Sequence, residues 1–174
     1  MTAGTWQLTN TSRPKMLDGT FATTNAFKLA LFTSGTNLGA ASAAYSGVTN
    51  EVGTTNTGYA TGGALIIPVL AGTVSVTWKA SNPSWTAGTA GLTAKSAAIY
   101  RVGSDVMAYS DLDSIGADVT ISSGSSLVLD LTTNAVFVIG EGVYILPNSA
   151  TLIAVGGQPV VNDGEFPFAF PHQF

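Results

Sequence analysis

The stretch Thr73-Val74-Ser75-Val76-Thr77-Trp78-Lys79-Ala80 decides the fold class, because apolar and polar side chains alternate along it. Successive side chains of an extended strand point to opposite faces of a sheet, so Val74, Val76 and Trp78 share one face. A helix would instead repeat its apolar positions every three to four residues. The stretch therefore predicts a half-buried β-strand, with Trp78 in the core in preference to serving as an exposed aromatic platform.

Short apolar runs of the same kind recur on both sides of this stretch, separated by clusters of Gly, Asn, Asp and Ser. Such spacing is typical of a sandwich or a barrel. The further strands that we expect span residues 26–33, 64–70, 95–101, 106–111, 118–122, 127–131, 135–139, 142–146 and 151–155. Strands this short and close together must find their partners in one sheet system. We therefore predict an all-β fold, a single antiparallel β-sandwich for which a jelly roll is one candidate form.

Three local features refine this prediction. Pro68 lies inside one of the runs and favours an edge strand or a bulge, because proline has no N–H to give to a sheet. The segment Val102-Gly103-Ser104-Asp105 predicts a hairpin turn between two of the strands. The Ala-rich stretch 40–45 is the one helix-tolerant segment and could form a single turn.

Two segments at the ends of the chain differ in composition from the middle. We expect residues 26–155 to form the sandwich domain. Residues 1–25 hold few core-type side chains and predict an N-terminal arm or a peripheral strand. Residues 156–174 open with a pair of glycines and predict a C-terminal arm, whose prolines favour an extended conformation.

The C-terminal arm is too apolar to remain free in water. It contains four phenylalanines, Phe166, Phe168, Phe170 and Phe174. Burying each of them would be worth roughly 1.5–3 kcal/mol. The arm therefore either folds back onto its own domain or docks on another subunit. We expect the second, because chain termini are seldom ordered without a reason.

The composition limits the classes of partner. Only 9% of the residues are charged, against roughly 25% in an average soluble domain, and the net charge is −4. The six basic residues are scattered, so we expect no direct nucleic-acid binding. No apolar run approaches the ~20 residues of a membrane helix, so we expect no membrane partner. Low charge fits a surface committed to neighbouring proteins and equally fits an ordinary Thr/Ser-rich β protein.

The residues of catalysis are scarce, and we predict that the chain is not an enzyme. Its one histidine, His172, lies near the C-terminus, where a general base would lack an orienting partner. It has no cysteine and no Gly-x-Ser-x-Gly motif. Asp111, Asp113 and Asp118 form the best acidic group for a hard cation, but the pattern lacks further carboxylates and Asp is also a common turn residue. We therefore predict no metal and no cofactor.

Two stretches resemble a family of small tailed-bacteriophage proteins. Phe27-Lys28-Leu29-Ala30-Leu31-Phe32-Thr33 is similar to the opening strand of that family. The loop Thr49–Gly63, with its Asn-Glu-Val, Gly-Tyr and Gly-Gly, is similar to the loop that follows. Weaker similarity extends to Trp85-Thr86, residues 92–100, residues 108–113, residues 117–120 and Ser123-Gly124. The resemblance covers about residues 26–131, and the chain departs from shorter members of the family by extending beyond them.

The resemblance implies a structural protein of the virion, made in the host cytoplasm. We expect a capsid decoration (cement) protein that forms homo-oligomers and binds the major capsid protein or other virion proteins. The alternative is a tail, baseplate or fibre component that contacts other tail proteins or a host glycan. The partner-binding residues that we predict come from the loop and the C-terminal arm: Asn50, Glu51, Tyr59, Phe166, Phe168, Phe170 and Phe174.

Overall fold

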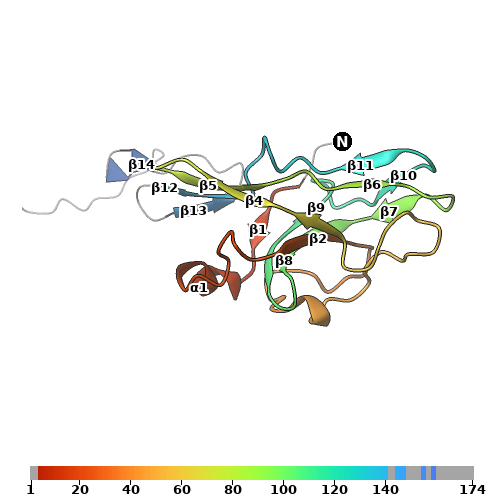
Figure 1. The fold of residues 1–174 in the computed structure, drawn as a ribbon, viewed down its shortest axis with the longest axis horizontal. Coiled ribbons are helices and arrows are strands. Elements are labelled where there is room, and N and C mark those ends of the chain that lie inside the picture. Colours follow the sequence, from red (N-terminus) through yellow and green to blue (C-terminus); the bar gives the residue numbers. More distant parts are fainter. Residues whose placement is uncertain (1–3, 141–143, 148–153, 156–157, 160–174) are drawn as a thin grey trace, which may run out of the picture.

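The computed structural model describes residues 4–140, 144–147, 154–155 and 158–159 of the chain (Figure 1). Within these residues every strand pairing is antiparallel, and sheets pack against one another across an apolar core. The predicted all-β antiparallel sandwich is therefore confirmed. No helix in the described part of the chain is long and apolar enough to cross a membrane.

One layer of the sandwich is a five-stranded sheet in the order β1-β9-β8-β2-β3. The strands are β1 (Gln7–Leu8), β2 (Phe27–Phe32), β3 (Ala64–Ile66), β8 (Ser96–Arg101) and β9 (Val106–Asp111). The predicted hairpin between β8 and β9 is present, and Gly103 adopts a left-handed conformation (φ 83°) in its turn.

The remaining strands form a four-stranded sheet and three two-stranded ribbons. The four-stranded sheet has the order β13-β12-β5-β4, with β4 (Pro68–Ala71), β5 (Val76–Ala80), β12 (Phe137–Gly140) and β13 (Tyr144–Pro147). The ribbons pair β6 (Ser84–Thr86) with β11 (Ser126–Val128), β7 (Leu92–Ala94) with β10 (Val119–Ile121), and β14 (Ala154–Val155) with β15 (Gln158–Pro159). In Figure 1, β4, β5 and β6 run above β2 and β8.

The core joins the five-stranded sheet to the strands opposite it. Phe27 and Leu29 of β2 are fully buried and belong to the same apolar cluster as Trp78 of β5 and Leu92 of β7. The Phe27 and Trp78 rings meet edge to face, with centroids 5.6 Å apart, and Trp78 stacks on Phe137. Trp78 is 2% exposed, which confirms its predicted place in the core. Trp85 and Tyr100 are also buried.

Strand β2 is buried on both of its faces, which explains its nearly continuous apolar sequence. Ala30 and Phe32 face away from the sandwich core and join a second cluster. That cluster is covered by side chains of the segment 38–48, namely Leu38, Tyr45 and Val48. This inner strand of the five-stranded sheet is therefore shielded by a loop on the side that faces away from the other layer.

The predicted helical turn at residues 40–45 is wrong. A short 3₁₀ helix, η1, instead spans Tyr45–Gly47. The backbone before it runs beside the β8–β9 turn, where the Val106 N–H donates to the Ala43 carbonyl (3.0 Å) and the Tyr45 N–H donates to the Ser104 carbonyl (3.0 Å). These tertiary hydrogen bonds hold Ala43 and Ala44 in an extended path after a turn in which the Ser42 N–H donates to the Gly39 carbonyl (3.0 Å), although the alanines are compatible with a helix.

The N-terminal segment is packed against the sandwich. Strand β1 lies at the edge of the five-stranded sheet beside β9, and a helix, α1 (Ser12–Leu17), follows it. Asp105 of the β8–β9 turn pairs with Lys15 of α1 and with Arg101 (3.1 Å). Burial favours a higher pKa for Asp105, but hydrogen bonds from Lys15, Ser104 and Arg101 outweigh it and lower this pKa.

Two predicted strands have different bounds in the structure. The stretch 73–80 is a strand only from Val76 onward, because Gly72 (φ 99°) begins a tight turn that leaves Val74 exposed. The run 64–70 is divided at Ile67: β3 pairs with β2 in one sheet, whereas β4 pairs with β5 in the other. Pro68 lies on the edge strand of its sheet, as predicted.

Candidate functional site

The loop that was singled out in the sequence is fastened to the sheet by the carboxylate of Glu51. Tyr59 donates its hydroxyl hydrogen to Glu51 Oε1 (2.6 Å), and the Gly62 N–H donates to the same oxygen (2.6 Å). Tyr45 donates to Glu51 Oε2. Tyr100 completes the group, because its ring stacks on Tyr45 with centroids 4.1 Å apart and its hydroxyl donates to the Gly62 carbonyl (2.8 Å). We call these four side chains (Tyr45, Glu51, Tyr59 and Tyr100) the Glu51 cluster.

The Glu51 cluster uses its polar atoms internally. The Tyr59 hydroxyl both donates to Glu51 and accepts a hydrogen bond from the Leu31 N–H (3.0 Å), so it ties the loop to β2. Burial and the neighbouring Glu51 carboxylate raise the pKa values of Tyr45 and Tyr59, and burial also raises that of Tyr100. Each hydroxyl is therefore a protonated donor near neutral pH. This arrangement stabilises a loop and presents no nucleophile activated by a free base.

The predicted partner-binding residues of the loop have different surroundings. Asn50 is exposed, adopts a left-handed backbone (φ 61°) and donates from its amide to the Gly35 carbonyl (2.6 Å). Glu51 is half-buried and Tyr59 is 4% exposed. The structure thus brings Glu51 and Tyr59 together inside the molecule and leaves Asn50 at the surface. Binding of a partner through these three residues stays a prediction. Phe166, Phe168, Phe170 and Phe174 lie outside the described residues.

Sequence reasoning did not connect Tyr45 and Tyr100 with the loop. Tyr45 ends an Ala-rich stretch, and Tyr100 belongs to an apolar strand far along the chain. They meet because β8 pairs with β2 while the segment 38–48 crosses the outer face of both strands. Glu51, which precedes the Gly58-Tyr59 pair by seven residues, was the local sign of an internal hydrogen-bond acceptor.

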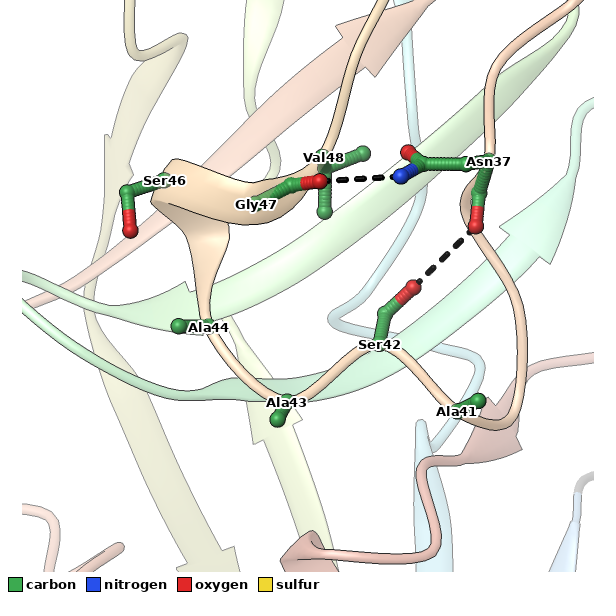
Figure 2. Close-up of a pocket in the computed structure, with 8 residues that line it drawn as sticks. All are labelled: Asn37, Ala41, Ser42, Ala43, Ala44, Ser46, Gly47 and Val48. Atoms are coloured by element: carbon green, nitrogen blue, oxygen red, sulfur yellow. Dashed lines mark hydrogen bonds between the residues drawn. The ribbon is translucent and has the colours of Figure 1, made fainter.

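The segment 38–48 also borders a shallow hollow of about 430 Å³, shown in Figure 2. The Asn37 amide nitrogen donates to the Gly47 carbonyl (2.9 Å), and Asn37 Oδ1 accepts from the Thr49 N–H (2.8 Å). The other lining residues are small and uncharged: Ala41, Ser42, Ala43, Ala44, Ser46, Gly47 and Val48. A hollow without titratable groups offers van der Waals contact and a few hydrogen bonds, and supplies no acid or base for catalysis.

Each of the acidic residues considered for a metal accepts a hydrogen bond from another residue. Asp111 Oδ1 accepts from the Ser96 hydroxyl (2.7 Å), Asp113 Oδ1 accepts from the Ile115 N–H (3.1 Å), and Asp118 Oδ2 accepts from the Ser34 hydroxyl (3.0 Å). Within the described part of the chain, no three His, Cys, Asp or Glu side chains gather closely enough to hold a metal ion.

A strip of large apolar side chains is exposed where the chain passes from β3 to β4. Leu65, Ile67 and Val69 are 61%, 64% and 52% exposed, and we call them the apolar strip. Ile67 and Val69 border a hollow of about 340 Å³ together with Lys79, Ala80, Ser81 and Thr132. Apolar side chains that are adjacent, exposed and at a sheet edge are characteristic of a surface that contacts another protein.

Comparison with known proteins gives no relative: no family model, no curated protein and no solved structure matches this chain.

The three tyrosines of the Glu51 cluster predict that the stability of the fold decreases at alkaline pH. The folded-state pKa values of Tyr45, Tyr59 and Tyr100 lie above the ordinary value of 10. Their contribution is therefore fully present below about pH 10 and is lost as the pH rises, because the unfolded chain releases protons that the folded chain retains. We expect the free energy of unfolding, measured in urea from pH 8 to 11, to decrease above about pH 10.

The Tyr59→Phe variant separates this effect from general alkaline damage. It should be less stable than the unmodified chain at pH 7, because it leaves the Leu31 N–H without its acceptor. Its stability should then decrease less steeply above pH 10, because one titrating group has been removed. Equal slopes for the two proteins would show that Tyr59 does not contribute.

Proposed function

We propose that this chain is a bacteriophage virion structural protein, and specifically a capsid decoration protein that binds the lattice of the major capsid protein. The resemblance of residues 26–131 to small tailed-phage proteins supports the virion setting. The observation that carries a binding role is the apolar strip. Its three side chains are more than half exposed at the junction of two sheet edges.

The surroundings of the apolar strip suit a protein partner. Burying apolar area of this kind contributes about 25 cal/mol per Å². The adjoining hollow has Lys79 as its one charged lining residue among those described. Interface cores are depleted in charge in the same way, while a single cation at the rim gives orientation.

The proposed mechanism is stabilisation by mass action. A protein that binds the assembled shell but not the free subunits shifts the equilibrium toward the shell. Individual contacts can be weak, because copies linked in a homo-oligomer bind the repeating lattice through several sites at once. The proposed partners are the major capsid protein and further copies of this chain.

Binding to capsids tests the proposal. The purified protein, mixed with expanded empty capsids of the phage that encodes it, should co-sediment in a saturable manner and in many copies per particle. The double variant Ile67→Lys with Val69→Lys should bind at least about tenfold more weakly, since it places charge in the proposed interface. Ile115→Lys is the matched control, because Ile115 is also apolar and 84% exposed but lies outside the strip.

The same experiment separates decoration from the alternative. A tail, baseplate or fibre component would fail to bind empty capsids and would be present in only a few copies in purified virions, located on the tail by antibody labelling. Equal capsid binding by the strip variant and the control would show that the apolar strip is not the interface. Circular dichroism should confirm that both variants are folded.

A further inference from the structure

The four-stranded sheet ends at β4 in an edge that has no further partner among the described residues. Strand β4 is the last strand in the order β13-β12-β5-β4, and its described neighbour is β5 alone. An edge of this kind presents N–H and C=O groups that can pair with another extended segment. Natural edge strands are commonly protected by charged side chains, whereas β4 carries none and has only Pro68 at its first position.

The hydrogen bonds of β5 show which groups of β4 point outward. The Val136 N–H donates to the Trp78 carbonyl (2.9 Å), so the backbone groups of Trp78 face β12. The Ser81 N–H donates to the Ile67 carbonyl (3.0 Å), so Ile67 faces β5. Backbone direction alternates along a strand. The carbonyl of Pro68 and both backbone groups of Leu70 therefore face away from the sheet.

One face of β4 borders an apolar groove. Residues directly opposite each other in an antiparallel pair have side chains on the same face, so Leu70 shares a face with Trp78. A groove of about 200 Å³ lies there, and its lining residues are all uncharged and include Met16, Phe21 and Leu70. Leu70 is 55% exposed. This face can therefore receive an apolar side chain from an added strand.

The other face of β4 carries a cation without an anion. Lys79 lies directly opposite Val69 and lines the hollow of about 340 Å³ beside the apolar strip. It has no ion pair within the described residues. Asp130 Oδ1 accepts from the N–H groups of Thr132 and Thr133 (3.1 and 3.0 Å). Lys79 is therefore available to attract a carboxylate of a partner.

The two faces define the sequence that an added antiparallel strand needs. The residue opposite Leu70 would exchange two hydrogen bonds with it, so this residue needs an N–H, and its side chain should be apolar. The next residue would lie opposite Val69. Neighbouring strands are about 4.8 Å apart, so an acidic side chain at this position and that of Lys79 would begin about 10 Å apart and could meet over Val69. The residue after that would donate its N–H to the Pro68 carbonyl.

A second copy of β4 does not satisfy this requirement. Strand β4 has no charged residue, so pairing of two copies with Leu70 opposite Leu70 would leave Lys79 of each copy without a carboxylate. The charge of this edge instead favours a segment in which acidic and apolar residues alternate.

We propose that the β4 edge binds an extended segment of a partner protein as an added antiparallel strand, with an apolar residue opposite Leu70 and an acidic residue beside Lys79. Main-chain hydrogen bonds would supply affinity, and the two faces would select the side chains. The inference rests on the proposed function, because Ile67 and Val69 of the apolar strip border the same hollow as Lys79. It adds the chemistry of the segment that the partner contributes.

Two peptides added to the full-length protein test the selection by charge. Val-Glu-Val-Glu-Val and Val-Lys-Val-Lys-Val, acetylated and amidated at their ends, are titrated while the Leu70 amide is followed by NMR. The acidic peptide should shift the Leu70 resonance in a saturable manner, and the basic peptide should bind at least about threefold more weakly. Lys79→Glu should reverse this preference. Lys95→Glu, the same change of charge at a site between β7 and β8, should retain it.

Two N-methylated forms of the acidic peptide test the strand pairing. Methylation of the central valine nitrogen removes the N–H that would donate to the Leu70 carbonyl. Methylation of the following glutamate nitrogen removes an N–H that would face away from β4. The first form should no longer shift the Leu70 resonance, whereas the second should bind within about threefold of the unmodified peptide.

Four results would overturn the inference. Neither peptide could bind at Leu70, the acidic and basic peptides could bind equally well, or the two N-methylated forms could be equally weak. The Leu70 amide could also be protected from hydrogen exchange in the free protein, which would show that the edge is already covered. Protection that decreases on dilution would identify a second copy as the cover.

The peptide measurements are separate from the capsid experiment. No capsid enters them, so capsid binding without peptide binding would leave the proposed function standing and overturn only the strand pairing. Peptide binding without capsid binding would leave the strand pairing at β4 standing and overturn only the capsid as the partner.

Discussion

Replacing Gly63 by alanine is expected to destabilise the protein by more than about 4 kcal/mol, or to prevent it from folding. Gly63 has φ 70°, which disfavours any side chain, and a Cβ placed there would lie 1.8 Å from the Leu29 carbonyl oxygen and 2.7 Å from the Ala30 Cα. Both neighbours are backbone atoms of β2, which is hydrogen-bonded to β3 and β8, and Leu29 and Ala30 are fully buried. Strand β2 cannot move aside without breaking its hydrogen bonds in the five-stranded sheet.

Gly53→Ala is the matched control from the same loop. A Cβ at Gly53 would have no atom within 4 Å, and Gly53 is not in the left-handed region. Its effect should stay within about 0.5–1 kcal/mol and could be stabilising, because alanine reduces the freedom of the unfolded chain. Urea or thermal unfolding followed by circular dichroism measures both variants. Similar stabilities for Gly63→Ala and Gly53→Ala would contradict the close packing of this loop on β2.

The second large effect is expected for Glu51→Ala, which should cost about 3 kcal/mol of unfolding free energy. The substitution removes the acceptor of three hydrogen bonds, given by Tyr45, Tyr59 and the Gly62 N–H. Hydrogen bonds to charged groups contribute about 1.5–3 kcal/mol each, but bonds that share one acceptor do not add independently. The buried Tyr59 hydroxyl would lose its acceptor, and this accounts for much of the loss.

A double-mutant cycle with Tyr59→Phe distinguishes the hydrogen bond from a general weakening of the loop. The two residues are in direct contact, so the double variant should be less destabilised than the sum of the single variants by about 1–2 kcal/mol. Glu51→Gln should lose less than Glu51→Ala, because its amide oxygen can still accept. If the losses of unfolding free energy in Glu51→Ala and Tyr59→Phe simply added in the double variant, the Glu51 cluster would not be a cooperative unit.

The features that sequence predicts well here are those that depend on neighbouring residues. Alternation along residues 73–80 placed Trp78 on a core-facing side, and turn residues located the β8–β9 hairpin. The division of the run 64–70 at Ile67 could not be predicted in this way. It depends on the pairing of β3 with β2 in one sheet and of β4 with β5 in the other. The extended path before η1 likewise depends on backbone groups of the distant β8–β9 turn.

The candidate site was only partly accessible from sequence for the same reason. Its loop was recognised by its glycines, and Gly63 does have the left-handed backbone that such residues allow. Tyr45 and Tyr100 join Glu51 only after β2 and β8 have paired. Sequence also cannot tell a tyrosine that donates to an internal carboxylate from one that contacts a partner, since both occur in polar, glycine-rich loops.

The position of β2 between β8 and β3 in its sheet also sets the order of events on the ribosome. Its hydrogen-bonding partner β8 begins at Ser96, about 65 residues after β2 ends at Phe32. At a synthesis rate of about 5–20 residues per second, the apolar segment Phe27–Phe32 emerges several seconds before β8 can pair with it. Pairing over such sequence distances also makes the folding transition slow. Production of this protein should therefore be sensitive to temperature and to chaperones that hold extended apolar segments during synthesis.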